Sequence, residues 1–183
     1  MMINAFYSDP HFGHKNIINL SARPFANIEH MHQELITRYN QVIAPHDVVM
    51  WLGDCAFCKP TKLKNILDGL NGKKILVRGN HDKSHAVMSA LGFDVVMDEC
   101  FMTIAGRSCR LKHFPYLDSE PPGIKRDDRY ANKRPPRIAG EILIHGHTHS
   151  KRRMFKNSIH VGVDAWDFRP VLFSEIEKII NEM

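Results

Sequence analysis

Five short polar segments of this chain carry side chains that bind divalent metal ions. In chain order they are Asp9-Pro10-His11, Gly53-Asp54, Gly79-Asn80-His81-Asp82, His113 and Gly146-His147-Thr148-His149. Divalent cations bind carboxylate oxygen and imidazole nitrogen, and alternate residues of an extended segment share one side. Asp-x-His and His-x-His therefore each place two donors together. One such pair is a weak signal, but five segments in one chain predict a metal centre.

Most of the polar segments follow a short apolar run of the kind that forms a buried strand. The clearest run is Ile75-Leu76-Val77, after which Gly79 lets the backbone turn sharply. The run from Val48 to Leu52 precedes Gly53-Asp54, and the run from Ile142 to Ile144 precedes the His-x-His segment. Open α/β sheets gather their ligands at the carboxyl ends of the strands. We therefore expect the five segments to meet at one end of the sheet structure.

The stretches between these runs predict helices and further strands. A helix is expected over residues 28–42, with Asn27 as its cap and apolar residues spaced by three and four. A second helix should begin at Lys59-Pro60, where proline is tolerated, and a third should cover residues 85–91. The order strand, helix, strand over residues 48–77 predicts a crossover with parallel strands. The remaining expected elements are strands at residues 95–97, 101–104, 109–112, 158–163 and 171–173, and a final helix with a capping box of Ser174 and Glu177.

Length and composition favour a single domain, residues 1–183. A chain of 183 residues, 43% of them hydrophobic, can bury one sizeable core but hardly two. No basic segment followed by an apolar stretch opens the chain, and no apolar run approaches membrane-spanning length. We therefore expect a cytoplasmic protein without a membrane partner. The formal charge of +5 favours an anionic partner such as phosphate or nucleic acid, with solvated surface charge as the alternative.

The four cysteines are more typical of reduced thiols than of a disulfide scaffold. Cys55 and Cys58 have the C-x-x-C spacing that redox proteins and zinc sites share, whereas Cys100 and Cys109 are too far apart to form a second such pair. Because Cys55 directly follows Asp54 at a strand end, we interpret it as a small buried residue. A redox protein remains the alternative.

In this order, the polar motifs resemble those of the calcineurin-like metallophosphoesterases, and in particular their small bacterial and phage members. The motifs of that family are D-x-H, G-D, G-N-H-D, a single H and G-H-x-H, and the match extends from about residue 3 to about residue 173. The resemblance implies an α/β fold that is a four-layer α/β/β/α sandwich, with two facing mixed sheets flanked by helices. The local patterns are compatible with this fold but do not by themselves predict it.

The resemblance also implies a role for each motif residue. Six residues would each bind one of two metal ions, Asp9, His11 and His149 the first, and Asn80, His113 and His147 the second. Asp54 would bridge the two ions, and His81, positioned by Asp82, would face the substrate. The expected cofactors are two Mn²⁺ ions, with Fe, Zn or Ni as alternatives.

A site of this kind would hydrolyse phosphate esters. Two cations about 3.5 to 4 Å apart lower the pKa of a bridging water and neutralise phosphoryl oxygens. We therefore expect hydrolysis of a phosphodiester, nucleotide-like in structure, or of a phosphomonoester, by attack of the bridging hydroxide. His81 would give a proton to the leaving oxygen. The alternatives are a metal-dependent nuclease and a non-catalytic interaction module of the same fold, whose members usually lack the histidine of G-N-H-D.

Residues 115–137 form the least regular stretch of the chain, with five prolines and a dense mixture of Asp, Arg and Lys. This is long for a loop in a compact domain, so the stretch is either functional or mobile. Because it begins just after His113, we expect a substrate flap in which Arg129 or Arg134 binds a phosphate through a planar guanidinium. His14 is a further candidate for contact with the substrate or the metal centre. A solvated surface loop and a packed loop histidine are the respective alternatives.

Overall fold

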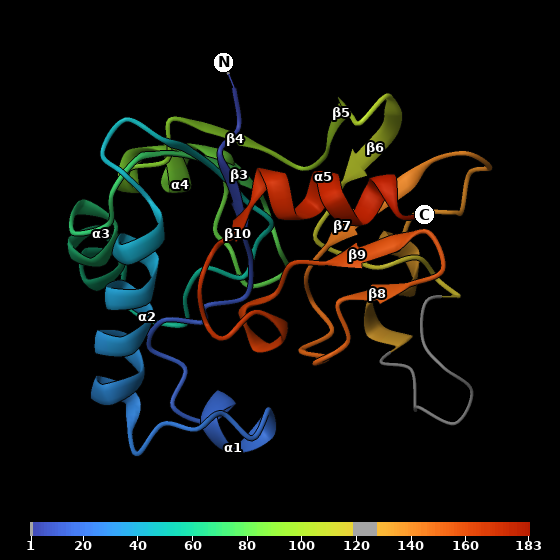
Figure 1. Cartoon of the computed structure of the whole chain (residues 1–183). Coiled ribbons are helices and arrows are strands. Elements are labelled where there is room, and N and C mark those ends of the chain that lie inside the picture. Colours follow the sequence, from blue (N-terminus) through green and yellow to red (C-terminus); the bar gives the residue numbers. More distant parts are fainter. Residues whose placement is uncertain (1, 119–127) are drawn as a thin grey trace.

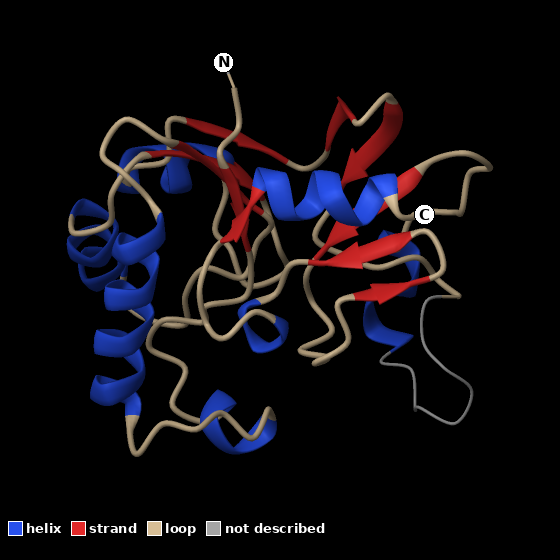
Figure 2. Ribbon diagram, viewed as in Figure 1, coloured by secondary structure: helices blue, strands red, loops and turns tan. Residues whose placement is uncertain are grey.

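Two mixed five-stranded sheets form the centre of the structure (Figures 1 and 2). The computed structural model describes residues 2–118 and 128–183, and for residues 128 and 129 it describes the backbone alone. The first sheet has the spatial order β10 (Val171–Leu172), β1 (Ala5–Tyr7), β2 (Val48–Trp51), β3 (Lys73–Val77) and β4 (Val95–Met97). The second has the order β5 (Cys100–Ile104), β6 (Arg107–Leu111), β7 (Ile142–His145), β9 (Ser158–His160) and β8 (Met154–Phe155).

Helices connect and cover these strands. They are α1 (Ile17–Leu20), α2 (Ile28–Val42), α3 (Pro60–Asp68), α4 (His85–Leu91) and α5 (Phe173–Asn181), with 3-10 helices η1 (Asp128–Lys133) and η2 (Val163–Ala165). As expected, Asn27 caps α2 by accepting a hydrogen bond from the backbone N–H of His30 at 2.8 Å, and Pro60 opens α3. No helix in the described part of the chain is both long and apolar enough to cross a membrane.

Helical crossovers make most of the first sheet parallel. β1, β2, β3 and β4 run in the same direction, whereas β10 joins the free side of β1 antiparallel to it. The predicted parallel pair on either side of α3 is confirmed. In the second sheet, β5 and β6 form an antiparallel hairpin, and β6, β7 and β9 are parallel neighbours. Parallel neighbours end on the same side of a sheet, which brings their following loops together.

Two apolar cores hold these layers in place. One lies between the first sheet and helices α2, α3 and α4, where Tyr7 and Trp51 are fully buried. The other lies between the two sheets, and α5 packs against it through Ile176 and Ile180. Each large apolar side chain that is fully buried stabilises the fold by about 1.5–3 kcal/mol relative to an exposed one. The strand ends that carry the polar motifs are therefore held in a rigid frame.

The predicted fold, two facing mixed sheets with flanking helices, is confirmed, and the differences lie at the ends of elements. The predicted capping box of Ser174 and Glu177 is wrong, because α5 begins at Phe173 and the backbone N–H of Leu172 donates to Glu175 instead, at 2.9 Å. Arg169 holds the Glu175 carboxylate in place with two hydrogen bonds of 2.8 and 2.7 Å. The strand expected over residues 158–163 ends at His160.

Candidate metal centre

The five polar segments meet where the carboxyl ends of strands from both sheets converge (Figure 1). Two groups of three side chains form there. In each group the potential ligand atoms lie within 4.8 Å of one another; the first group is Asp9, His11 and His149, and the second group is Asp54, His113 and His147. β1, β2 and β3 lead into the motifs of the first sheet, and β6 and β7 into those of the second. The centre therefore depends on both sheets.

The carboxylate of Asp54 belongs to the second group and also lies close to the first. Its Oδ2 atom is 3.5 Å from Nε2 of His11 in the first group and 3.5 Å from Nε2 of His113 in the second. Asn80 joins the second group, with its Oδ1 atom 3.2 Å from Nε2 of His113. This is the placement that a carboxylate needs to contact two ions at once.

The backbone of the centre is held in an unusual conformation. Five of the candidate ligands have positive φ angles, namely Asp9 (59°), His11 (51°), Asp54 (54°), His147 (72°) and His149 (51°). For a residue with a Cβ atom this left-handed region costs roughly 1–2 kcal/mol, and such strain concentrates at functional sites. The strand-end loops share backbone hydrogen bonds, from the Asp9 N–H to Gly53 at 3.1 Å and from the His11 N–H to Asp54 at 3.2 Å. The surrounding loops thus hold the ligands in conformations that they would not adopt alone.

Two motif glycines allow the loops to approach closely. A Cβ atom at Gly79 would clash with the carboxylate of Asp54, and one at Gly146 would clash with Ser8 and with the carboxylate of Asp9. The glycines of G-N-H-D and G-H-x-H are thus required by the distance between the loops and not by a positive φ angle.

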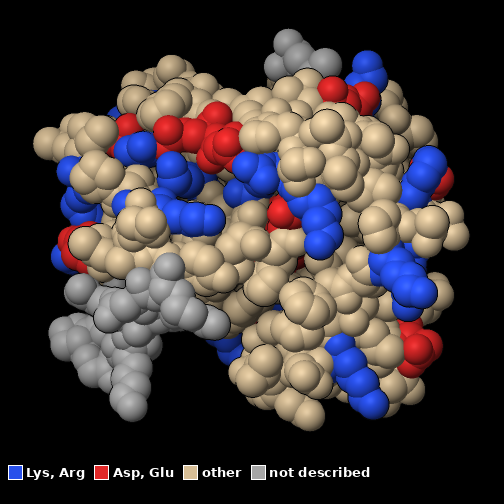
Figure 3. Space-filling view, turned by 180° about the vertical axis from the view of Figure 1, so that it is seen from behind, with Lys and Arg blue, Asp and Glu red and all other residues tan. Residues whose placement is uncertain are grey.

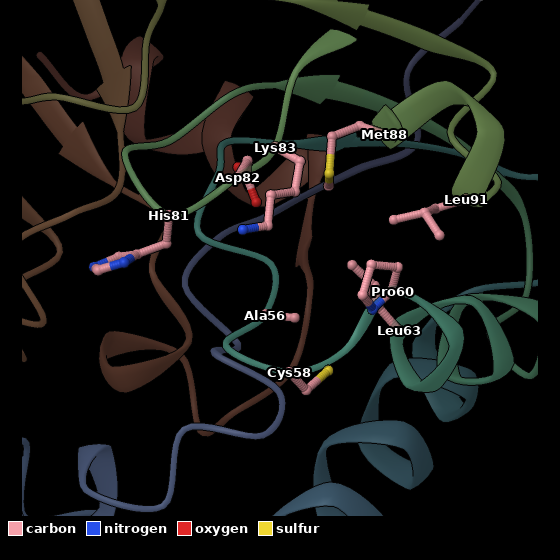
Figure 4. A pocket seen from close by; sticks show the side chains of 9 residues that line it. All are labelled: Ala56, Cys58, Pro60, Leu63, His81, Asp82, Lys83, Met88 and Leu91. Carbon is pink, nitrogen blue, oxygen red and sulfur yellow. The ribbon is translucent and has the colours of Figure 1, made fainter. Parts of the chain in front are cut away.

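Asp82 has a different role from the predicted one. Its carboxylate accepts hydrogen bonds from the backbone N–H groups of Asp54 at 2.9 Å, Gly79 at 2.8 Å and Cys55 at 3.0 Å. The expectation that it positions the His81 imidazole is therefore corrected, and the two side chains point in different directions (Figure 4). The turn after β3 folds against the loop after β2, so Asp82 fastens the two loops together.

His81 lies at the open side of the centre. Its backbone N–H donates to Oδ1 of Asp54 at 2.9 Å, and its Nε2 atom lies 3.9 Å from Oδ2 of the same carboxylate. About a third of the side chain is exposed, 33%. An imidazole so placed can reach a ligand bound at the two groups and exchange protons with solvent.

His14 lies beside the first group, on the same side as His81. Its ring stacks on Phe57 with centroids 5.0 Å apart and lies 5.4 Å from the ring of His11. Phe57 is also 5.3 Å from the His81 ring and is 56% exposed. His14, Phe57 and His81 together form an aromatic rim. Phe57 was not predicted, because a lone aromatic residue in a loop has no distinctive spacing.

Arg23 and Asp164 support the first group, and sequence reasoning missed both. Asp164 binds Nδ1 of His149 at 2.9 Å and accepts two hydrogen bonds from Arg23 at 2.8 Å each. The same guanidinium donates to the backbone carbonyls of Asp9 at 2.8 Å and Pro10 at 3.0 Å. Both side chains are buried. A carboxylate on one imidazole nitrogen orients the other for a metal, but a lone Arg and a lone Asp far apart in sequence give no signal of this.

Burial keeps His11 and His147 neutral, as metal ligands must be, whereas His113 carries a proton without a metal. Burial lowers the pKa of His11 well below its usual value, and burial together with His113 lowers the pKa of His147 to about 3. Burial also disfavours charge on Asp54 and His113, but their mutual attraction outweighs it, lowering the pKa of Asp54 and raising the pKa of His113 to about 9. A cation bound at the second group would replace this proton.

The buried ring of His11 independently fits a metal. Neither of its ring nitrogens has a hydrogen bond within the part of the chain that the structure describes. Burying a polar group without a partner costs free energy, roughly 1–3 kcal/mol by mutational data. A cation shared with Asp9 and His149 would supply the missing partner.

The predicted flap is described only in part. Arg134 lines a cleft of about 580 Å³ that also includes Asn80. Residues 119–127 and the side chain of Arg129 lie outside the described residues. The proposed contact of Arg129 with substrate therefore stays a prediction.

Comparison with known proteins agrees with the motifs. The model of the calcineurin-like phosphoesterase superfamily domain matches residues 2–162. The chain is 31% identical to the uncharacterized protein MJ1445 of Methanocaldococcus jannaschii over 184 residues, covering 96% of this chain and 89% of that protein. It is also 31% identical to the Gene 66 protein of Mycobacterium phage L5 over 202 residues, covering 97% and 94%. A crystal structure of a protein of unknown function, AQ665 from Aquifex aeolicus, has a TM-score of 0.71 at 28% identity and covers 96% of this chain and 97% of that one. The chain therefore belongs to the calcineurin-like phosphoesterase superfamily.

Proposed function

We propose that this protein is a two-metal phosphoesterase that hydrolyses a nucleotide-like phosphodiester or a phosphomonoester. The observation that carries the proposal is the position of Asp54, whose Oδ2 atom lies 3.5 Å from one histidine of each group. Divalent cations held there would lower the pKa of a water molecule and neutralise phosphoryl oxygens. Membership of the phosphoesterase superfamily supports the same reaction class.

In this reaction the residues of the chain would bind the cations and donate a proton. The first group would hold one cation, and His113 and His147 with Asn80 the other, with the ionised Asp54 between them. These oxygen and nitrogen donors suit Mn²⁺, with Fe, Zn or Ni as alternatives. His81 would donate a proton from Nε2 to the leaving oxygen, since that atom faces the space beside Asp54. Its presence at the centre favours an enzyme over a non-catalytic interaction module.

The cysteines do not favour redox chemistry. Burial raises the pKa of Cys55 well above its usual value and also raises the pKa of Cys58, so both thiols stay protonated near neutral pH. The two thiols are free, and Cys58 faces a small pocket of about 20 Å³ together with Met88 and Leu91 (Figure 4). A pocket of this size holds about one water molecule.

Metal removal and reconstitution test the proposal. The protein is dialysed against a chelator, reloaded separately with Mn²⁺, Fe²⁺, Zn²⁺ and Ni²⁺, and assayed with p-nitrophenyl phosphate, bis(p-nitrophenyl) phosphate and cyclic nucleotides. Chelation should abolish hydrolysis, at least one ion should restore it, and a thiol-blocking reagent should have no effect. Hydrolysis that survives chelation, or no hydrolysis of any substrate with any ion, would contradict the proposal.

Hydrolysis of nucleic acid is a second candidate function. The observation that favours it is a basic cleft adjoining the metal centre. A polynucleotide held by Lys and Arg would bind more weakly as salt increases. The salt dependence of substrate binding therefore distinguishes a polyanionic substrate from a small ester.

A further inference from the structure

A basic cleft of about 580 Å³ opens directly beside the second group. Its cationic residues come from the turn after β3, from strand β6 with its following residues, and from the end of η1; they are Arg78, Arg110, Lys112, Lys133 and Arg134. Among the described residues that line the cleft, two carboxylates, Asp82 and Asp98, accompany these five cations. On the back of the molecule, Lys and Arg side chains gather around a hollow, with Asp and Glu side chains at its margin (Figure 3).

The two carboxylates of the cleft are already engaged. Asp82 binds backbone N–H groups, and Asp98 accepts hydrogen bonds from Arg78 at 2.6 and 3.0 Å. Lys112 lies 3.4 Å from Glu99, which also binds Arg110. Glu141 also lies 3.9 Å from Arg110. These contacts hold Arg78, Arg110 and Lys112 in defined positions, and among the described residues the five cations still outnumber the carboxylates beside them. The cleft is therefore a preformed surface for an anion.

The cleft adjoins the metal centre at the second group. Asn80 lines the cleft and lies 3.2 Å from His113. Phe114 also lines it, and its ring centroid is 4.9 Å from that of His147. The aromatic rim instead adjoins His11 of the first group. An ester bound at the centre would thus meet imidazole groups on one side and fixed cations on the other.

We propose that this cleft is a subsite for a second phosphate group of a nucleotide-like substrate. The inference rests on the proposed phosphoesterase function and specifies its substrate. The volume is within the range of small-ligand pockets, and Arg and Lys are the usual phosphate-binding residues. The second phosphate can come from an oligonucleotide backbone or from a nucleoside polyphosphate, which share this chemistry.

A matched pair of substrates isolates the second phosphate. The p-nitrophenyl ester of thymidine 5′-phosphate is compared with the same ester carrying a 3′-phosphate, so the reacting bond and leaving group are identical. The metal-loaded wild type should prefer the second ester by about tenfold or more in kcat/KM, the difference that one good charged contact gives. Lys112→Ala and Arg78→Ala should each lose most of this preference, whereas Lys112→Arg should keep it.

A control variant comes from a different groove. Arg38 and Arg169 line a groove beside α2 that contains none of the metal-centre residues. Arg38→Ala should therefore leave the preference between the two esters unchanged. Circular dichroism confirms that each variant is folded before its kinetics are compared.

Binding without hydrolysis gives an independent measurement. Thymidine 3′,5′-bisphosphate should bind to the metal-free protein in calorimetry, more weakly to Lys112→Ala, and more tightly than thymidine 5′-monophosphate. Equal binding of the two nucleotides by every variant, together with equal kcat/KM for the two esters, would overturn the subsite and leave the phosphoesterase intact. Hydrolysis of neither ester with any ion would instead contradict the proposed function.

Two further substrates distinguish the sources of the second phosphate. Short thymidylate oligomers represent the nucleic-acid backbone, and a dinucleoside polyphosphate represents the polyphosphate. Preference for the oligomers, with a KM that rises with salt and a weaker salt dependence in Lys112→Ala, supports a nuclease. Preference for the polyphosphate supports a nucleotide hydrolase. Both outcomes support the subsite. If Lys112→Ala hydrolysed both substrates as fast as wild type, the subsite would be contradicted.

Discussion

Among single residues, His81 and Asp54 are in direct contact, yet the proposed reaction gives them separate tasks. The backbone of His81 is fixed by its hydrogen bond to Asp54 Oδ1, while its ring remains a third exposed. Asp54 points toward both ligand groups, but the His81 ring lies at their open side. Loss of the His81 ring should therefore affect proton transfer and leave the ligand groups intact.

His81→Gln should retain the metal content and lose rate. The expected loss in kcat is about a hundredfold to ten-thousandfold for an alkyl ester, because general acid catalysis has that magnitude. With p-nitrophenolate, a leaving group that needs no proton, the loss should be much smaller. His46→Gln is the control, since His46 is exposed and precedes β2, whereas Asp54 follows the carboxyl end of that strand. An equal loss with good and poor leaving groups would argue against proton donation.

Asp164→Asn should weaken the first group selectively. The amide keeps the size of the side chain but removes the charge that holds Arg23 and orients His149. Loss of such a supporting contact typically costs ten- to hundredfold in metal affinity. Calorimetric titration with Mn²⁺ should show one weakened site and one normal site. The control is Glu175→Gln, which removes a carboxylate that pairs with Arg169 and should leave both metal sites normal. Unchanged Mn²⁺ binding in both variants would exclude the supporting role of Asp164.

Most residues of the two groups could be singled out because they belong to motifs with their own spacing, whereas His113, a single histidine, came from the family resemblance. The support from Arg23 and Asp164 could not be predicted, because these residues are 141 positions apart and meet only in the folded chain. The role predicted for Asp82 was wrong for a related reason. Whether a carboxylate in a turn binds the next ring or a neighbouring backbone depends on how close the adjoining loop lies, and sequence does not give that distance.

At the scale of elements, the loops after β2 and β3 are joined through Asp54, Gly79 and Asp82. Gly79→Ala should therefore disturb both loops, because the added methyl clashes with the Asp54 carboxylate. We expect a loss of about 1–3 kcal/mol in unfolding free energy, as for other overpacked sites, and weaker metal binding.

Thermal unfolding with and without Mn²⁺ measures this effect. Gly69→Ala is the matched control, because the nearest atom to its added Cβ would lie at an ordinary 3.5 Å. If Gly79→Ala had the same melting temperature and metal affinity as the control, the two loops would have space for the added methyl group, and the prediction would be contradicted.

Long elements with regular patterns were predicted well, and short ones were not. The apolar spacing of residues 28–42 and the Asn27 cap gave the bounds of α2. The helix α1, with four residues, and the strand β8, with two, are too short for any pattern to emerge. The start of α5 depends on Arg169, because its hydrogen bonds to Glu175 favour a helix that begins at Phe173. The capping box predicted from Ser174 would have begun the helix later.

At the scale of the whole molecule, the metal centre lies across the junction of the two sheets. Asp9 and Asp54 follow strands of the first sheet, and His113 and His147 follow strands of the second. Cations bound there would link both sheets and stabilise the folded chain. The pairing of these sheets is non-local, so the strand runs alone did not predict it, and it came from the family resemblance.

Addition of metal should raise the melting temperature of the metal-free protein. Binding to the folded state alone stabilises it by about 2.7 kcal/mol for each site when free Mn²⁺ is a hundredfold above its dissociation constant. Differential scanning fluorimetry at increasing Mn²⁺ gives the shift, with Mg²⁺ and Ca²⁺ for comparison. Identical melting curves with and without every ion would mean that the folded chain has no preference for metal.

The central claim is that Asp54 joins two metal ions, and metal content measured together with activity tests it most directly. Wild type, Asp54→Asn and the control Asp68→Asn, whose carboxylate pairs with Lys64 on the surface, are loaded with Mn²⁺, freed of excess ion and analysed by elemental mass spectrometry. Wild type and Asp68→Asn should hold two ions per chain and hydrolyse bis(p-nitrophenyl) phosphate. Asp54→Asn should hold fewer than two and lose activity, because a neutral amide bridges two cations poorly. Two ions per chain and normal turnover in Asp54→Asn would contradict the account.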